Sequence, residues 1–213
     1  MASIDSLKAQ GKWDMANDCP LTEARSDPFG ATAHKMKQRL RDQIMYVRTG
    51  GHTERFHTKR TLTQDFVGHH SFNVAWLAHF MSIHLGQVER YTLLLAALEH
   101  DLPEQEFGDV PAPAKRGMGI REVWGEHERD LNHQMGCGYE DALSGEGKRI
   151  LKIADAVDGM FHCAMERALG NQTMRGCFEN FQEYAAELLD NGKHHERIVF
   201  ELAQEAWQEV NNG

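Results

Sequence analysis

The stretch Leu93-Leu-Leu-Ala-Ala-Leu-Glu-His100-Asp101-Leu-Pro103 decides the fold of this chain. Apolar side chains occupy nearly every face of the helix that we expect at about residues 88–100, which is typical of a helix buried at the centre of a bundle. Pro103 disfavours helical backbone at Leu102, so this helix should end near Asp101. His100 and Asp101 would then lie at a helix end, where their side chains can turn into a cleft.

Helices are also expected on both sides of this stretch. Met36, Leu40 and Ile44 recur at a spacing of four residues until Gly50-Gly51 ends the run. Similar patterns predict helices at about 69–85, 121–134, 145–169, 173–190 and 194–211. Since no window shows the alternation of a strand, the sequence predicts an all-α fold, a single helical bundle whose neighbouring helices pack antiparallel.

One domain is expected. The 213 residues are enough to bury a full core, and 41% hydrophobic with 26% charged residues is ordinary for a globular protein. Residues 1–30 are polar, contain Pro20 and Pro28 and lack a clear period, so we interpret them as a loosely packed N-terminal arm. Residues 31–213 then form the domain.

The net charge restricts the partners. At −9 the chain is a poor match for a nucleic-acid polymer, because non-specific binding depends on Lys and Arg neutralising phosphates. The basic residues Lys35, Lys37, Arg39 and Arg41 are interpreted as a solvated helix face. An anionic small molecule would therefore need a local device, either a metal ion or a well-placed Arg or Lys.

The sequence indicates a cytoplasmic protein. Its cysteines, Cys19, Cys137, Cys163 and Cys177, form no CxxC pair and suit a reducing compartment as free thiols. The N-terminus has no secretory pattern, and no stretch approaches 18 apolar residues, so no membrane association is expected.

Two histidines and two aspartates from three expected helices form a candidate ligand set for one divalent metal. His70 precedes the His100-Asp101 pair by 30 residues, and Asp155 follows His100 by 55 in the apolar run Ile150–Val157. Imidazole and carboxylate without thiolate point to a metal with open, water-filled positions rather than to structural zinc. Ligand type does not choose among Co²⁺, Mn²⁺, Zn²⁺, Ni²⁺, Fe²⁺ and Mg²⁺.

Each member of this set also has an ordinary structural interpretation. Asp155 alone would suit a buried ion pair or a capping network, and His70 or His100 alone would suit a core or surface histidine. Adjacent helical residues point about 100° apart, so His69 and His70 are not expected to share a metal. We choose His70 because it is in line with the apolar residues that follow at 74, 77 and 81, and we interpret His79, His84, His127 and His162 as structural.

The motifs around this set resemble those of the HD-domain phosphohydrolases, and more narrowly the bacterial 5′-deoxynucleotidases and the phage dATP triphosphohydrolases. The matching segments are Arg55-Phe56, Gly68-His-His-Ser71, His100-Asp-Leu-Pro-Glu104, Gly108-Asp-Val-Pro-Ala-Pro-Ala-Lys115 and Ala154-Asp-Ala156. The similarity covers roughly residues 35–190. The Gly-Asp-x-Pro-x-Pro-x-Lys segment is its most specific part, because other HD branches lack it.

The resemblance implies a role for each matching residue. His70, His100, Asp101 and Asp155 would bind the metal, Arg55 would hold a phosphate, and Glu104 would position or activate the attacking water. Asp109 would lie in the nucleotide site. For Lys115, a site role and a surface role are equally supported.

Two positions depart from the bacterial nucleotidases. Phe56 stands in place of a tryptophan and His69 in place of an acidic residue, which bears on base and sugar preference but leaves the metal set intact. We predict that the Phe56 ring packs near C2′ and penalises a ribose hydroxyl. The alternative is that Phe56 is a core residue anchoring the segment Thr53–Val67.

The sequence therefore predicts a metal-dependent phosphohydrolase acting on 2′-deoxynucleotides at the 5′ phosphate ester. The preferred substrate is dATP, which would be hydrolysed to deoxyadenosine and tripolyphosphate. The alternatives are a 5′-deoxynucleotidase acting on deoxynucleoside monophosphates and a non-catalytic nucleotide-binding module. An alarmone or cyclic-nucleotide hydrolase is disfavoured because the motifs of those branches are absent. The long amphipathic helices at 173–211 suit a homo-oligomer interface and the core of a monomer equally well.

Overall fold

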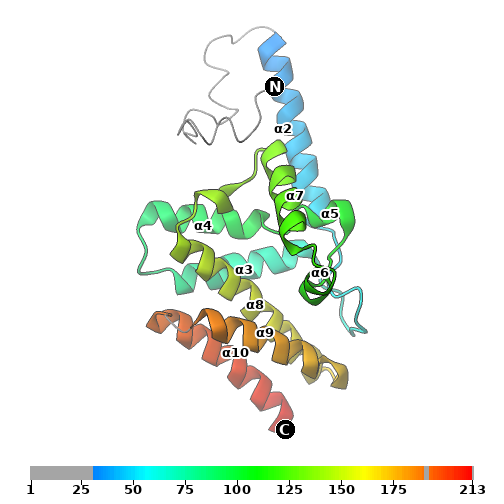
Figure 1. Cartoon of the computed structure of the whole chain (residues 1–213), viewed down its shortest axis with the longest axis vertical. Coiled ribbons are helices and arrows are strands. Elements are labelled where there is room, and N and C mark those ends of the chain that lie inside the picture. Colours follow the sequence, from blue (N-terminus) through cyan, green and yellow to red (C-terminus); the bar gives the residue numbers. More distant parts are fainter. Residues whose placement is uncertain (1–30, 190–191, 213) are drawn as a thin grey trace. The chain divides into compact units, whose positions relative to one another are not determined.

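The computed structural model of the chain describes residues 31–189 and 192–212 (Figure 1). Within these ranges every regular element is a helix, and the one β-type pairing is an isolated antiparallel bridge between Glu54 and Phe66. The all-α prediction is confirmed. The chain divides into two units, residues 1–46 and 47–213, and every predicted site residue belongs to the second. The predicted arm 1–30 lies outside the described residues, so the boundary at residue 30 remains a prediction.

Helix α2, Ala31–Gly50, contains the predicted run of apolar residues and ends at Gly50, as the sequence predicts. Its basic residues Lys35, Lys37, Arg39 and Arg41 are all exposed, which agrees with a solvated face.

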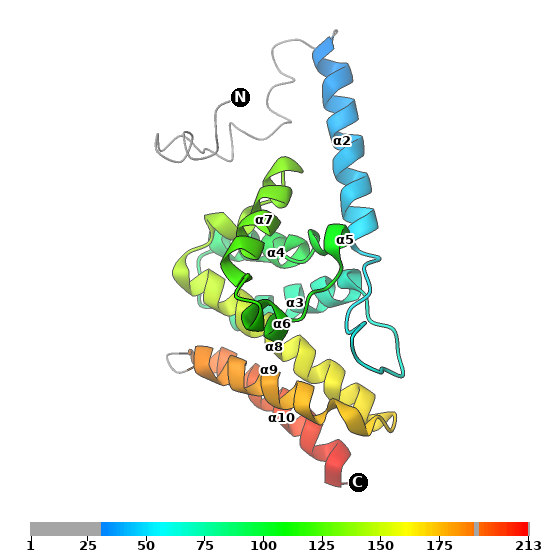
Figure 2. The same ribbon diagram turned by 45° about the vertical axis from the view of Figure 1, so that its right-hand side comes forward.

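Three helices form the centre of the second unit: α3 (Val67–Met81), α4 (Gln87–Glu99) and α8 (Gly145–Ala168), each in contact with the other two (Figure 1). Helices α9 (Arg175–Leu188) and α10 (His194–Asn212) pack against α8, and the turned view in Figure 2 shows them running together along it. The amphipathic faces of 173–211 thus contribute to this chain's own core, and an oligomer remains a prediction.

The two most apolar helices are central for the reason that the sequence indicates. On α4, Leu93, Ala96 and Ala97 are fully buried, and on α8 Ile153 and Ala154 are fully buried beside Asp155. Ser144 caps the start of α8 by accepting a hydrogen bond from the Gly147 amide at 3.1 Å. This packing fixes the faces of α4 and α8 that carry the candidate ligands.

Helix α3 begins two residues earlier than expected and ends about one turn earlier than expected. It stops at Met81 because Ser82 offers a competing bond: its hydroxyl donates to the His79 carbonyl at 3.3 Å. The following residues form a turn closed by the Leu85 amide and the Ser82 carbonyl at 2.8 Å. Leu85 still packs against the core from this turn.

Four short helical segments were not expected. These are α5 (Glu104–Phe107), α6 (Ala112–Gly117) and the 3₁₀ segments Tyr139–Ala142 and Gln172–Met174, whereas α7 (Arg121–Gln134) has the predicted bounds. Segments this short contain too few residues to display a period. No described helix combines the length and apolar character needed to cross a membrane.

Candidate metal centre

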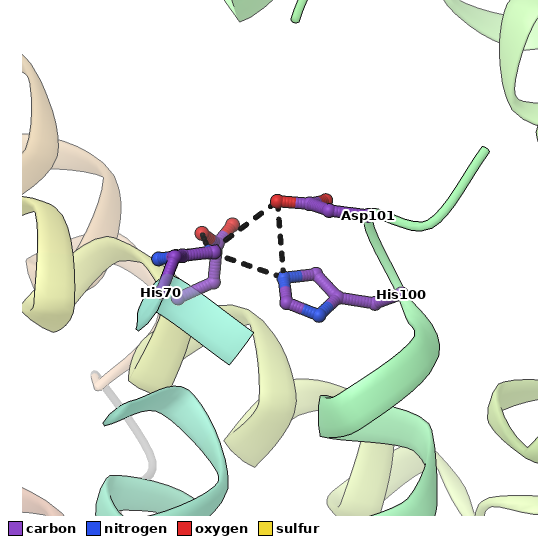
Figure 3. A group of neighbouring side chains, drawn as sticks. His70, His100 and Asp101 are labelled. Atoms are coloured by element: carbon purple, nitrogen blue, oxygen red, sulfur yellow. Dashed lines mark hydrogen bonds and ion pairs between the residues drawn. The ribbon is translucent and has the colours of Figure 1, made fainter. Parts of the chain in front are cut away.

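The structure brings the four predicted metal ligands together. His70 comes from the first turns of α3, His100 and Asp101 follow the last residue of α4, and Asp155 lies in the middle of α8. One ligand atom from each residue lies within 4.8 Å of all the others. Figure 3 shows the rings of His70 and His100 facing one another with Asp101 beside them. We call these four residues the metal-centre cluster.

The distances within the metal-centre cluster fit a shared cation. His70 Nε2 lies 3.2 Å from His100 Nε2, 3.3 Å from Asp101 Oδ2 and 3.1 Å from Asp155 Oδ1. Ligand atoms about 2.1 Å from one metal are separated by about 3.0 Å in octahedral and about 3.4 Å in tetrahedral geometry. All three separations fall in that interval.

Second contacts of the imidazoles direct their Nε2 atoms to the metal position. His100 Nδ1 lies 2.8 Å from the Ala97 carbonyl and His70 Nδ1 lies 2.7 Å from Asp158 Oδ2. Both partners only accept, so both Nδ1 atoms carry the proton and both Nε2 atoms present a lone pair. Sequence reasoning missed Asp158; its position three residues after Asp155, on the same helix face, was the available signal.

The electrostatics of the cluster favour an added cation. Burial and Arg55 lower the pKa of His70, but hydrogen bonds to Asp101, Asp155 and Asp158 raise it well above its ordinary value. The carboxylates therefore stabilise positive charge at the His70 ring. A divalent cation supplies that charge while leaving the imidazole neutral, so the residues present fit a metal.

Arg55 lies at the edge of the metal-centre cluster. Its Nη1 donates to Asp101 Oδ2 at 2.6 Å, and its Nε lies 3.4 Å from Asp65 Oδ2. The side chain is buried, and the surrounding carboxylates outweigh burial and raise its pKa further above an already high value. The guanidinium is therefore permanently charged at the edge of the metal-centre cluster.

Glu104 begins α5, one turn beyond Asp101. Its Oε2 is buried and makes no hydrogen bond in the described structure. Burial first, and then the charges of Asp101 and Asp109, raise the pKa of Glu104 well above its ordinary value. A buried carboxylate oxygen without a partner is costly, and a water or substrate group would satisfy it.

Asp109 and Phe56 contact one another through the backbone, because the Phe56 amide donates to Asp109 Oδ2 at 3.2 Å. Phe56 has a φ of 54°, a left-handed backbone that is unusual for an aromatic residue. Its ring stacks on His162 with centroids 4.5 Å apart and meets the edge of Phe181 at 6.1 Å. These contacts support the core-anchoring alternative for Phe56, and its sugar-sensing role remains a prediction.

Lys115 has a partner away from the ligands. Its Nζ donates to Glu128 Oε1 of α7 at 2.7 Å and lies 5.4 Å from the centre of the Trp124 ring. Its charge still lowers the pKa of Glu104, so it contributes to the field of the site. A direct contact with substrate remains a prediction.

Comparisons with known proteins agree on one family. The model of a family described as 5′-deoxynucleotidase YfbR-like matches residues 45–203. The chain is 28% identical over 131 residues to a 5′-deoxynucleotidase of Yersinia pestis (strain Pestoides F) and to one of Yersinia pseudotuberculosis serotype O:1b (strain IP 31758). Each match covers 53% of this chain and 66% of the relative, just under two thirds of the relative's length.

A solved structure shows the same fold. The cyanophage S-2L HD phosphohydrolase DatZ, bound to dA and one catalytic Zn²⁺ ion, is similar with a TM-score of 0.63 at 15% sequence identity. The similarity covers 79% of this chain and 96% of that chain.

Proposed function

Because the chain belongs to the YfbR-like 5′-deoxynucleotidase family, we propose that it is a metal-dependent phosphohydrolase that converts 2′-deoxynucleoside 5′-monophosphates to deoxynucleosides and phosphate. The observation that carries the proposal is the metal-centre cluster with its two oriented Nε2 lone pairs, in contact with Arg55. A bare cation site does not need a permanently charged guanidinium beside it. A site for a phosphate ester does.

The chemistry divides among the residues of the site. The metal-centre cluster would hold a divalent cation, which when bound would supply Lewis-acid polarisation to a phosphate ester. Arg55, pinned on one side by Asp101, keeps the rest of its guanidinium for phosphate oxygens. Glu104 uses its unpartnered Oε2 to take a proton from the attacking water. The bond between phosphorus and the 5′ oxygen breaks, and the proton held by Glu104 is returned to that leaving oxygen.

The comparisons favour monophosphates over dATP. The matching family model and the Yersinia relatives are described as 5′-deoxynucleotidases, whereas DatZ at 15% identity supports only the fold. We therefore place the monophosphate alternative ahead of the lean to dATP. In this proposal Asp109 and Phe56, joined at the Phe56 amide, face the sugar.

Paired assays test the substrate. The purified protein is incubated with dAMP or dATP and a mid-row divalent ion, and the products are resolved as orthophosphate, tripolyphosphate and deoxyadenosine. We expect orthophosphate from dAMP, with AMP turned over roughly ten- to a hundredfold less efficiently because a buried 2′ hydroxyl lacks a partner. Tripolyphosphate released from dATP would support a dATP triphosphohydrolase instead. Nucleotide binding without turnover would support the non-catalytic alternative.

A further inference from the structure

The loop between Phe56 and Asp65 is closed at its base and exposed at its tip. The Arg55 amide donates to the Asp65 carbonyl at 2.9 Å, just inside the Glu54–Phe66 bridge. A loop of this length with its ends together is a compact surface loop whose shape depends on its own anchors. Phe56 begins this loop and Arg55 immediately precedes it, so the conformation of the loop determines where their side chains point.

Glu166 of α8 binds the second half of this loop. Its carboxylate accepts hydrogen bonds from the Leu62 amide at 2.7 Å, the Thr63 amide at 2.7 Å and the Thr63 hydroxyl at 2.6 Å. Asn171 Nδ2 donates to the same carboxylate at 2.8 Å. The Glu166 side chain is fully buried under the loop although the neighbouring loop residues are largely exposed.

Asn171 binds the loop at a third residue, Arg60. Its Nδ2 also donates to the Arg60 carbonyl at 2.8 Å, while its Oδ1 accepts from the Thr173 hydroxyl at 2.7 Å. Gly170, with a φ of 102°, makes the turn that returns Asn171 to the end of α8. Glu166 of α8 and Asn171, three residues after the end of α8, therefore fix the loop at residues 60, 62 and 63.

One face of α8 carries both the metal ligand and the loop contacts. Asp155 belongs to the metal-centre cluster, Asp158 orients His70, His162 stacks on Phe56, and Glu166 anchors the loop. These positions recur at spacings of three and four residues, and the first and last are about 16 Å apart along a straight helix. A rigid helix thus sets the distance between the metal and the loop that carries Arg55 and Phe56.

The hydrogen bonds keep Glu166 ionised in this buried position. Burial alone would raise the pKa of Glu166, but bonds from Asn171, Thr63 and Leu62 lower it to about 2. An apolar side chain could fill the same volume without a desolvation cost, yet it would accept nothing from the two loop amides. The carboxylate therefore selects one conformation of the loop.

We propose that Glu166 is a positioning residue that, by anchoring Leu62 and Thr63, sets Arg55 and Phe56 for substrate capture and sugar selection. The proposal rests on the proposed function, since Arg55 and Phe56 act there on phosphate and sugar. It assigns to Glu166 no contact with substrate and no role in binding the metal.

The test compares Glu166→Gln with Glu196→Gln. The first variant preserves shape but turns an amide NH₂ group toward donors, so at least one loop bond is lost. Glu196 is the matched control because it is equally buried but pairs with Arg149 of α8, away from the loop. Measurements are hydrogen exchange at the Leu62 and Thr63 amides, metal per chain, and KM and kcat for dAMP and AMP.

We expect Glu166→Gln to lose exchange protection at Leu62 and Thr63 while keeping its metal. KM for dAMP should rise about 10- to 100-fold with a smaller change in kcat, and the preference for dAMP over AMP should shrink. Glu196→Gln should retain the protection, KM and preference of the wild type. Thr63→Val, which removes only the hydroxyl donor, should shift the same quantities in the same direction by less, and it serves if Glu166→Gln does not fold.

The outcomes separate this proposal from the proposed function. A wild type that hydrolyses neither nucleotide overturns the proposed function and this inference with it. An active wild type whose Glu166→Gln and Thr63→Val variants keep wild-type KM and sugar preference overturns the inference alone. Equal kinetic losses in Glu166→Gln and Glu196→Gln would also overturn it, because they would show a general loss of stability.

Discussion

The metal-centre cluster has a counterpart in the same bundle, formed by His84, Glu146 and Glu196. In both groups, candidate ligand atoms lie within 4.8 Å of one another, and His84 Nε2 is 3.1 Å from Glu146 Oε1. In the counterpart, however, Arg149 already neutralises Glu196 through two bonds of 2.7 and 2.9 Å. We call this group the Arg149 cluster.

The difference lies in which polar atoms remain without a partner. Glu196 is fully buried, and besides Arg149 it accepts the Lys193 amide at 3.0 Å, so its oxygens are satisfied within the chain. Around the metal-centre cluster, two Nε2 lone pairs converge, and Glu104 Oε2 has no hydrogen bond to any residue that the structure describes. Proximity of histidine and carboxylate is therefore weak evidence for a metal, whereas oriented lone pairs are strong evidence.

The largest expected effect comes from breaking the metal-centre cluster. Asp155→Ala should lose the bound metal and all measurable turnover while keeping its helical circular dichroism, since the Asp155 side chain is 39% exposed and its removal leaves little void. Chelation of the wild type should have the same effect, reversed by a divalent ion. Full turnover in excess chelator, with no metal by elemental analysis, would contradict a metal-dependent reaction.

The next effect concerns the unpartnered carboxylate. Glu104→Ala should retain metal and nucleotide binding but lose about 10²- to 10⁴-fold in kcat, the usual scale for a positioned acid or base. Single-turnover kinetics and calorimetric titration with dAMP separate the two quantities. Near-normal turnover would move the proton-transfer role to another carboxylate, with Asp109 as the next candidate.

Disrupting the Arg149 cluster should lower stability without affecting metal content or turnover. Arg149→Met leaves the buried Glu196 without its cation, so the free energy of unfolding should fall by about 3 kcal/mol. Metal content and kcat at a temperature where the variant is folded should match the wild type. Denaturant unfolding and elemental analysis measure both, and a loss of metal in Arg149→Met would show that the two clusters are not independent.

A smaller effect tests the orientation of His70. Asp158→Asn keeps the size of the side chain but weakens its hold on the Nδ1 proton, so metal affinity should fall about 10- to 100-fold. Competition with a metal-binding dye measures the change. An unaltered affinity would mean that packing alone orients the His70 ring.

The smallest effect is expected at His84. The His84 side chain is 24% exposed, and its partner Glu146 is itself 38% exposed. His84→Ala should change the free energy of unfolding by less than about 0.5 kcal/mol and leave the metal content unchanged. A drop in metal stoichiometry would identify the Arg149 cluster as a second metal site.

Much of this comparison was accessible from sequence. The apolar run before His100, the proline after it and the apolar neighbours of Asp155 are local properties, so they predicted the helices. Together with the family resemblance they predicted the candidate ligand set that the structure brings within 4.8 Å. His84 was interpreted as structural without an identified carboxylate. Its partner Glu146 is 62 residues away, at a spacing that no helical period can reveal.

The sequence by itself determined the all-α class and the bounds of α7, and it identified the candidate His/His/Asp/Asp set, because side-chain chemistry and helical period are local properties of the chain. Only the tertiary structure decided that Asp158 orients His70, that Lys115 pairs with Glu128 and that Phe56 stacks on His162. It also decided that Glu166 anchors a loop 103 residues earlier in the chain. The physical reason is that a hydrogen bond depends on which faces meet and at what distance, and packing sets both.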